Sequence, residues 1–137
     1  MVSAIVPNGS ADLSGSRRPG GLSRQLRLLR HADFERVYKQ GRRHFATHMT
    51  VFYLRRDGDS NLRVGFTVGR ALGGAVERNR MKRRLREAVR LHRPLALMGV
   101  DVVINPKKSL LTAGFADIES EITRAFQVIQ KASTNTR

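Results

Sequence analysis

The sequence predicts one domain of the α+β class, with helices covering a small sheet. Strand character is concentrated in three segments of alternating or β-branched residues, at 47–54, 62–68 and 100–104. Apolar residues recur at helical spacing in three other places, around Phe34, from about Ala75 to Leu91, and after Thr112. The order helix, strands, helix, strand, helix fits one compact unit of 137 residues.

The first helix and the two strands after it are defined by spacing and turn residues. Phe34, Val37 and Tyr38 stand at positions i, i+3 and i+4, so they share one helix face. Gly41 can end this helix as its C′ residue. Because Asp57-Gly58-Asp59 is typical of a turn, we expect the two strands to form an antiparallel pair joined by a loop.

The last strand and the last helix also have recognisable boundaries. The strand at 100–104 is followed by the breaker Pro106, and Thr112 is a suitable N-cap for the final helix. The apolar residues of that helix recur on one stripe: Phe115, Ile118, Ile122, Ala125, Phe126 and Ile129. The stripe predicts a helix with one face packed against the domain.

The predicted domain spans residues 24–132. Residues 1–23 are rich in Ser, Gly, Pro and Ala and have no sustained period, which predicts a disordered basic tail. The apolar stretch before Pro7 is too short for the core of a secretory signal. We expect residues 133–137 to form a flexible C-terminal tail.

Composition indicates a soluble protein with a polyanionic partner. The chain has 26 Lys and Arg against 11 Asp and Glu, a formal net charge of +15, and no Cys. Because such an excess of positive charge repels itself, nucleic acid is the expected partner class. An anionic membrane surface is the alternative, but it favours large apolar anchors, and the chain lacks Trp. The lack of disulfides and of a membrane-length apolar run favours a cytoplasmic location.

The positive charge is concentrated in residues 78–93, where seven Arg and one Lys accompany a single acid, Glu87. Nearly every neighbour four residues away is also positive, so the isolated helix is destabilised by a repulsion that a polyanion would relieve. One narrow apolar stripe can pack against the sheet: Met81, Leu85, Ala88 and Val89. Arg78 lies on the line of this stripe, and an unpaired guanidinium is costly to bury. We therefore expect the packed face to end at Arg78, where the guanidinium is solvated or paired.

Two other interpretations of this helix are weaker. A merely solubilising surface does not require such a charge imbalance. A basic zipper that reads DNA needs a heptad run after the basic segment, and none follows. The helix therefore favours an RNA-binding protein.

Residues 73–87 read Gly-Gly-Ala-Val-Glu-Arg-Asn-Arg-Met-Lys-Arg-Arg-Leu-Arg-Glu. This segment resembles the protein subunit of bacterial ribonuclease P, and its central Arg78-Asn79-Arg80 matches the signature of that family. Further agreement in order and spacing lies upstream: Arg27-Leu28, Asp33-Phe34, Val37-Tyr38, Gly41 and Leu62–Val68. Together these motifs cover about residues 24–131. The resemblance implies an α-β-β-β-α-β-α fold with a left-handed βαβ crossover, similar to domain 2 of ribosomal protein S5.

The resemblance also implies a function. In this family, a catalytic RNA removes the 5′ leader from precursor tRNA, and the protein broadens substrate binding and supports Mg²⁺-dependent cleavage. The chain is thus expected to be a non-catalytic subunit of an endoribonuclease, a hydrolase, with one protein per RNA and no DNA or membrane partner. Mg²⁺ is expected to be held mainly by the RNA, since it prefers octahedral oxygen ligands and keeps waters. A ribosomal or general RNA-binding module shares the basic helix and is the alternative class.

Residues matched to the family's motifs are expected to form two sites. The basic region that faces the catalytic RNA comprises Arg78, Asn79, Arg80, Lys82, Arg83 and Arg86, with one further phosphate contact from Arg70. The cleft for the single-stranded leader comprises Phe34, Tyr38 and Phe52, because aromatic rings bordered by cations stack unpaired bases. Phe34 and Tyr38 also lie on the apolar face of the first helix, so core packing is the alternative role for both.

The chain departs from the family pattern at several positions. Gly69-Arg70-Ala71 stands where a Ser-Lys-Lys run is common, and Gly74 stands where a basic residue is frequent. Asn105-Pro106 replaces a region that usually contains Arg, which leaves Lys107 and Lys108 to make any contact there. Histidines and acids show neither metal-ligand spacing nor a two-metal carboxylate cluster, so we expect no catalytic residue and no protein ligand to a metal.

Overall fold

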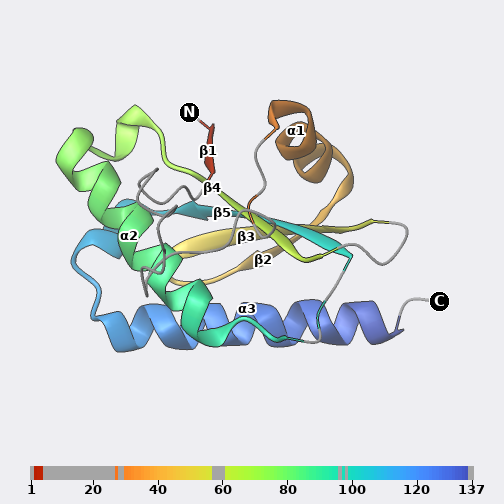
Figure 1. Ribbon diagram of the computed structural model, residues 1–137. Helices are drawn as coiled ribbons and strands as arrows, with labels where there is room; N and C mark the ends of the chain where they lie inside the picture. The colour runs from red at the N-terminus through yellow and green to blue at the C-terminus, as the bar shows by residue number, and fades with distance from the viewer. Residues whose placement is uncertain are drawn as a thin grey trace, which may run out of the picture.

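The computed structural model describes residues 2–4, 27, 30–56, 61–95, 97 and 99–135 (Figure 1). Its elements follow in this order: β1 (Val2–Ala4), α1 (His31–Gln40), β2 (Arg42–Phe45), β3 (Met49–Arg55), β4 (Arg63–Thr67), the 3-10 turn η3 (Arg70–Leu72), α2 (Ala75–His92), β5 (Val100–Pro106), the 3-10 turn η4 (Lys108–Leu111) and α3 (Phe115–Asn135). From α1 to α3 the helices and strands have the order α-β-β-β-α-β-α. The predicted α+β class is confirmed.

The strands form one mixed sheet in the order β1-β4-β5-β3-β2. At its centre, β5 is parallel to β4 and antiparallel to β3. Since α2 connects the parallel neighbours β4 and β5, the expected βαβ unit is present, while the handedness of its crossover stays a prediction.

The predicted pairing of β3 with β4 is wrong, because β5 lies between them. Every residue of β5 except Asn105 is buried. A strand that is buried on both faces takes a central position, with a neighbour on each side. The alternation within β3 and β4 predicted strands but did not specify their partners.

Parts of both predicted tails lie in regular secondary structure. Val2–Ala4, which the sequence placed in a disordered tail, pair with the edge of β4 and supply partners for its unpaired backbone groups. The rest of residues 1–23 lies outside the described residues. At the other end, α3 continues to Asn135, because no Gly or Pro interrupts the chain after Phe115.

Two hydrophobic cores lie on opposite faces of the sheet. The larger core joins the sheet to α2 and α3, and the smaller core, with Phe34, Val37 and Val103 at its centre, lies under α1 (Figure 1). The apolar stripe predicted for α2 is fully buried, and the stripe predicted for α3 is buried except for Phe115, which is half-buried. Among the described helices, none is both long enough and apolar enough to cross a bilayer.

Two helix ends differ from the sequence expectation. Gly41 closes α1 with extended backbone, φ −84° and ψ 177°, and not with the left-handed conformation of a C′ glycine. Glycine is required there by a close approach, because a Cβ would lie 2.5 Å from the Tyr53 carbonyl oxygen and 2.6 Å from that of Val37. Thr112 is not the N-cap of α3; it ends η4, and its hydroxyl donates to the Ser109 carbonyl at 3.4 Å.

Candidate RNA interface

The predicted basic region lies on α2 and the turn before it, on sides that do not face the sheet. Asn79, Arg80 and Arg83 are exposed, as is Arg70 in η3. The others are half-buried: Arg78, Lys82 and Arg86. Burial of the apolar stripe fixes the rotation of α2, so these polar side chains project away from the core.

The start of α2 is held by backbone contacts. Gly73 has φ 142°, in the region that favours glycine, and its carbonyl accepts a hydrogen bond from Nε of Arg78 at 3.2 Å. The Glu77 carboxylate accepts a hydrogen bond from the backbone N–H of Gly74 at 2.9 Å. Arg78 is thus paired at the end of the packed face, as its position on the apolar line predicted. This bond uses one of the five guanidinium donors, so the planar fork can still bind a phosphate.

Positive charges crowd one another along this helix. Burial, and next the neighbouring Arg78, lowers the pKa of Lys82. The only acid within the basic segment, Glu87, is paired with Arg90 at 2.7 Å, and the hydrogen bond from Arg90 lowers the pKa of Glu87. A bound polyanion would relieve the repulsion between the remaining cations.

One arginine of α2 has a structural role. The guanidinium of Arg84 donates to the carbonyls of Leu110, Leu111 and Ala113, at 2.9, 3.1 and 2.5 Å respectively. These bonds connect α2 to η4 and to the turn that precedes α3. Helical spacing alone does not predict this role, because it does not reveal a partner 26 residues away.

The three residues predicted to line the leader cleft lie at different depths in the structure. Tyr38 and Phe52 are half-buried, and their rings meet edge to face with centroids 4.8 Å apart. Phe34 is fully buried beneath α1, so its ring is not available to stack on a base in this conformation. The structure thus brings Tyr38 and Phe52 together at the surface and places Phe34 in the core.

Two polar residues that the sequence did not assign to this site hold the Tyr38 ring. The Tyr38 hydroxyl contacts Oδ1 of Asn105 at 3.0 Å and the hydroxyl of Thr67 at 2.5 Å. Thr67 ends β4, and Arg70 follows it in η3, so the chain passes directly from the aromatic surface to the start of the basic region. Strand alternation could have placed Thr67 and Asn105 on the same face, but their shared partner depends on the sheet order.

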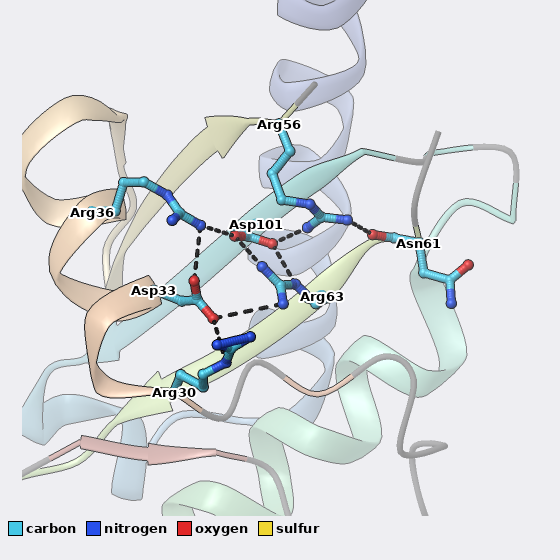
Figure 2. Close-up of polar contacts among 7 residues, drawn as sticks. All are labelled: Arg30, Asp33, Arg36, Arg56, Asn61, Arg63 and Asp101. Carbon is cyan, nitrogen blue, oxygen red and sulfur yellow. Dashed lines mark hydrogen bonds and ion pairs between the residues drawn. The ribbon is translucent and has the colours of Figure 1, made fainter. Parts of the chain in front are cut away.

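A charge network around the buried carboxylates of Asp33 and Asp101 joins α1 to the sheet. Its members, shown in Figure 2, are Arg30, Asp33, Arg36, Arg56, Asn61, Arg63 and Asp101. Asp101 is fully buried and accepts two hydrogen bonds from Arg63, at 2.9 and 2.8 Å, and another from Arg56. The bond to Asp101 raises the pKa of Arg63. Because Asp33 in α1 pairs with the same Arg63, the network joins α1 to β4 and β5.

Histidines near α3 are paired with acids. The backbone N–H of His48 donates a hydrogen bond to the Glu121 carboxylate at 2.9 Å, and the His92 ring lies 2.9 Å from the Glu119 carboxylate. In the part of the chain that the structure describes, no three histidine or acidic side chains are grouped closely enough to hold a metal ion.

Comparison with known proteins gives one consistent family. The sequence profile described as ribonuclease P matches residues 22–130. The ribonuclease P protein component of Oleidesulfovibrio alaskensis is 44% identical over 90 residues, which cover 65% of this chain and 72% of that protein. The component from Symbiobacterium thermophilum is 37% identical over 106 residues, covering 77% of this chain and 92% of that protein.

Solved structures show the same fold. The ribonuclease P protein from Thermotoga maritima is similar with a TM-score of 0.63 and 26% identity, over 70% of this chain and 90% of that one. The protein from Staphylococcus aureus is similar with a TM-score of 0.64 and 24% identity, over 74% of this chain and 93% of that one.

Proposed function

Because the chain belongs to the ribonuclease P protein family, we propose that it is the non-catalytic protein subunit of a ribonucleoprotein that removes the 5′ leader from precursor tRNA. The catalytic RNA carries out the cleavage, and the protein binds that RNA and the leader. One observation carries this proposal. The signature Arg78-Asn79-Arg80 lies at the fixed start of a helix whose apolar stripe is buried and whose remaining sides are cationic.

The basic region on α2 is proposed to bind the catalytic RNA. Arginine suits this role because its planar fork binds phosphate oxygens in pairs, whereas lysine acts as a point charge. Asn79 adds both a donor and an acceptor beside Arg78 and Arg80. Arg70 extends the cationic surface beyond the start of the helix.

The half-buried rings of Tyr38 and Phe52 are proposed to bind the single-stranded leader. Stacking on aromatic rings tolerates any base, which suits a leader of variable sequence. Phe34 supports these rings from the core and is not proposed to contact RNA.

Mg²⁺ is proposed to be held mainly by RNA phosphates and water, with no protein ligand. Protein cations near the RNA reduce phosphate repulsion and so lower the Mg²⁺ concentration that the RNA needs. One protein is proposed to bind each RNA, with no DNA or membrane partner.

The test is reconstitution of the full chain with a bacterial ribonuclease P RNA. We expect the chain alone not to cleave precursor tRNA, and the complex to cleave at lower Mg²⁺ than the RNA alone. Arg78→Gln with Arg80→Gln should weaken RNA binding about tenfold or more, since each loses a charge-assisted hydrogen bond. Lys131→Gln, which removes an exposed charge on α3, is the matched control and should bind as the wild type does.

Two results would refute the proposal. One is cleavage by the RNA-free chain that survives the loss of Arg78 and Arg80. The other is equal affinity of the assembled complex for mature tRNA and for leader-bearing precursor, which would indicate a general RNA-binding module.

A further inference from the structure

The edge strand β2 carries two exposed side chains beside the aromatic surface. In the pairing of β2 with β3, Arg43 stands opposite Phe52 and Phe45 stands opposite Thr50. Side chains of directly paired residues lie on the same face of a sheet. Arg43 and Phe45 therefore lie on the Phe52 side, which is the side that α1 partly covers.

These residues form a continuous strip of rings and charge. The Arg43 guanidinium carbon lies 5.7 Å from the centroid of the Phe45 ring and 5.9 Å from that of Phe52. Phe52 in turn meets Tyr38 edge to face. The strip Tyr38–Phe52–Arg43–Phe45 thus runs from α1 across β3 to the edge of the sheet.

Phe45 is unusual because it is large, apolar and 67% exposed. An exposed ring is ordinary when it is isolated. Here a guanidinium lies between it and a second ring, within the distance at which a cation interacts with an aromatic face.

We infer that Arg43 and Phe45 extend the aromatic surface into a second stacking position for single-stranded RNA. The occupant is a nucleotide of the 5′ leader beyond those that contact Tyr38 and Phe52, so the inference rests on the proposed function. Continuity with the Tyr38 and Phe52 rings and complementary charge both favour this occupant. Neighbouring strands are about 4.8 Å apart, so the step from β3 to β2 gives room for a further base. Bases within a duplex are stacked on one another, which leaves unpaired nucleotides as the class that fits.

The test measures dissociation constants of the assembled ribonucleoprotein for precursors with leaders of increasing length and for mature tRNA. With Phe45→Ala, we expect about fivefold or greater weakening for long leaders only, which is the range for loss of one stacked base. Phe45→Trp should retain the wild-type affinity because it keeps an aromatic face. Leu95→Ala, which removes another exposed apolar side chain, is the matched control and should have no effect.

A second measurement locates the nucleotide. Abasic substitutions are placed one at a time along a long leader, and each is titrated against wild type and Phe45→Ala. At one position, the lost base should weaken binding by the wild type but not by the variant, because both changes remove the same contact. Thermal melting of each variant checks that the fold is retained.

The outcomes separate this inference from the proposed function. If the wild type prefers longer leaders and Phe45→Ala has the same preference, the inference is overturned while the proposed function stands. An equal loss of affinity for mature tRNA and all precursors would also overturn it, because the effect would not involve the leader. If the wild type does not distinguish precursor from mature tRNA, both ideas fail together.

Discussion

The hydroxyl of Tyr38 donates a hydrogen bond to Oδ1 of Asn105 at 3.0 Å, which joins α1 to the central strand β5. Its single proton is used there, so the Thr67 hydroxyl, 2.5 Å away, donates to the tyrosine oxygen. Asn105 stands in a region where the family resemblance leads one to expect Arg. Here its side chain orients an aromatic ring.

We therefore expect Tyr38→Phe to distinguish the role of the hydroxyl, which orients the ring, from the role of the ring, which is proposed to stack on a base. Loss of the hydroxyl should reduce the free energy of unfolding by about 1–2 kcal/mol, since two hydrogen bonds disappear. Affinity for leader-bearing precursor should fall by no more than about twofold, because the ring remains. Urea denaturation and precursor titration measure the two effects. A large affinity loss with unchanged stability would show that the hydroxyl itself contacts RNA.

Phe34→Ala should act on stability and not directly on RNA. The side chain is fully buried, so its loss leaves a cavity and should cost about 3–5 kcal/mol in the free energy of unfolding. Phe34→Leu fills most of that cavity and should cost much less. Precursor affinity of the folded Phe34→Leu variant should match the wild type, and a selective loss for precursor would place this ring in the leader cleft after all.

Arg83 and Arg84 are neighbours in sequence but should respond differently to loss of charge. Arg84→Gln removes a clamp on three carbonyls and should reduce stability by about 2–3 kcal/mol. Arg83→Gln, at an exposed position, should leave stability unchanged and reduce the slope of log affinity against log salt by about one. Chemical denaturation and a salt titration of RNA binding measure both variants. The reverse pattern would contradict the assigned roles.

Asp101→Asn should be among the most destabilising conservative substitutions in this chain. The carboxylate is fully buried against Arg56 and Arg63, so its neutralisation removes the negative charge that both guanidinium groups share, at a cost of about 3–5 kcal/mol in the free energy of unfolding. The control is Glu119→Gln, which breaks the more exposed pair with His92 and should cost about 0–1 kcal/mol. Equal small losses in the two variants would mean that the network does not hold α1 in place.

The stability of the protein should depend on the protonation of His44. Burial, and next the charge of Arg124, lowers the pKa of His44 below its ordinary value, and this outweighs the opposing effect of Glu121. The unfolded chain therefore binds more protons than the folded protein once the pH falls below about 6.5. Stability should be fully present above that pH and decrease as the pH falls through the lowered folded-state value.

Replacement of this histidine tests the sign of the effect. In His44→Gln, the decrease in Tm between about pH 7.5 and pH 5.5 should be smaller than in the wild type, because one titrating group is gone. Thermal melting at both pH values gives the comparison. An unchanged decrease would show that other histidines account for it.

Local pattern predicted the helices better than it predicted the sheet. The stripe from Met81 to Val89 follows from helical spacing alone, and all of its members are buried. The pairing of β3 and β4 was wrong because strand order depends on a segment that comes later in the chain, β5. The need for glycine at position 41 likewise comes from Tyr53, which is distant in sequence.

In the candidate site, too, local pattern predicted some features, while others depend on contacts between residues distant in sequence. Charge imbalance identified the basic helix, but only the fold distinguishes Arg84, which is fastened to η4, from exposed Arg83. Helical spacing placed Phe34 and Tyr38 on one face of α1, but it could not show that Phe34 is fully buried while Tyr38 is half-buried. Phe45 was missed because its neighbours Arg43 and Phe52 meet it only through the register of β2 with β3.

The central position of β5 has a consequence for the order of folding. As the chain leaves the ribosome, β3 and β4 appear first, and they cannot complete a sheet because their common neighbour, residues 100–106, has yet to be made. Such late, long-range pairing slows folding, and open strand edges can meanwhile join other chains. A fragment that ends before Val100 would therefore expose two unsatisfied edges and should aggregate. The shortest segment able to fold independently must extend through β5, so α2 and its basic surface acquire their final position only when the sheet closes.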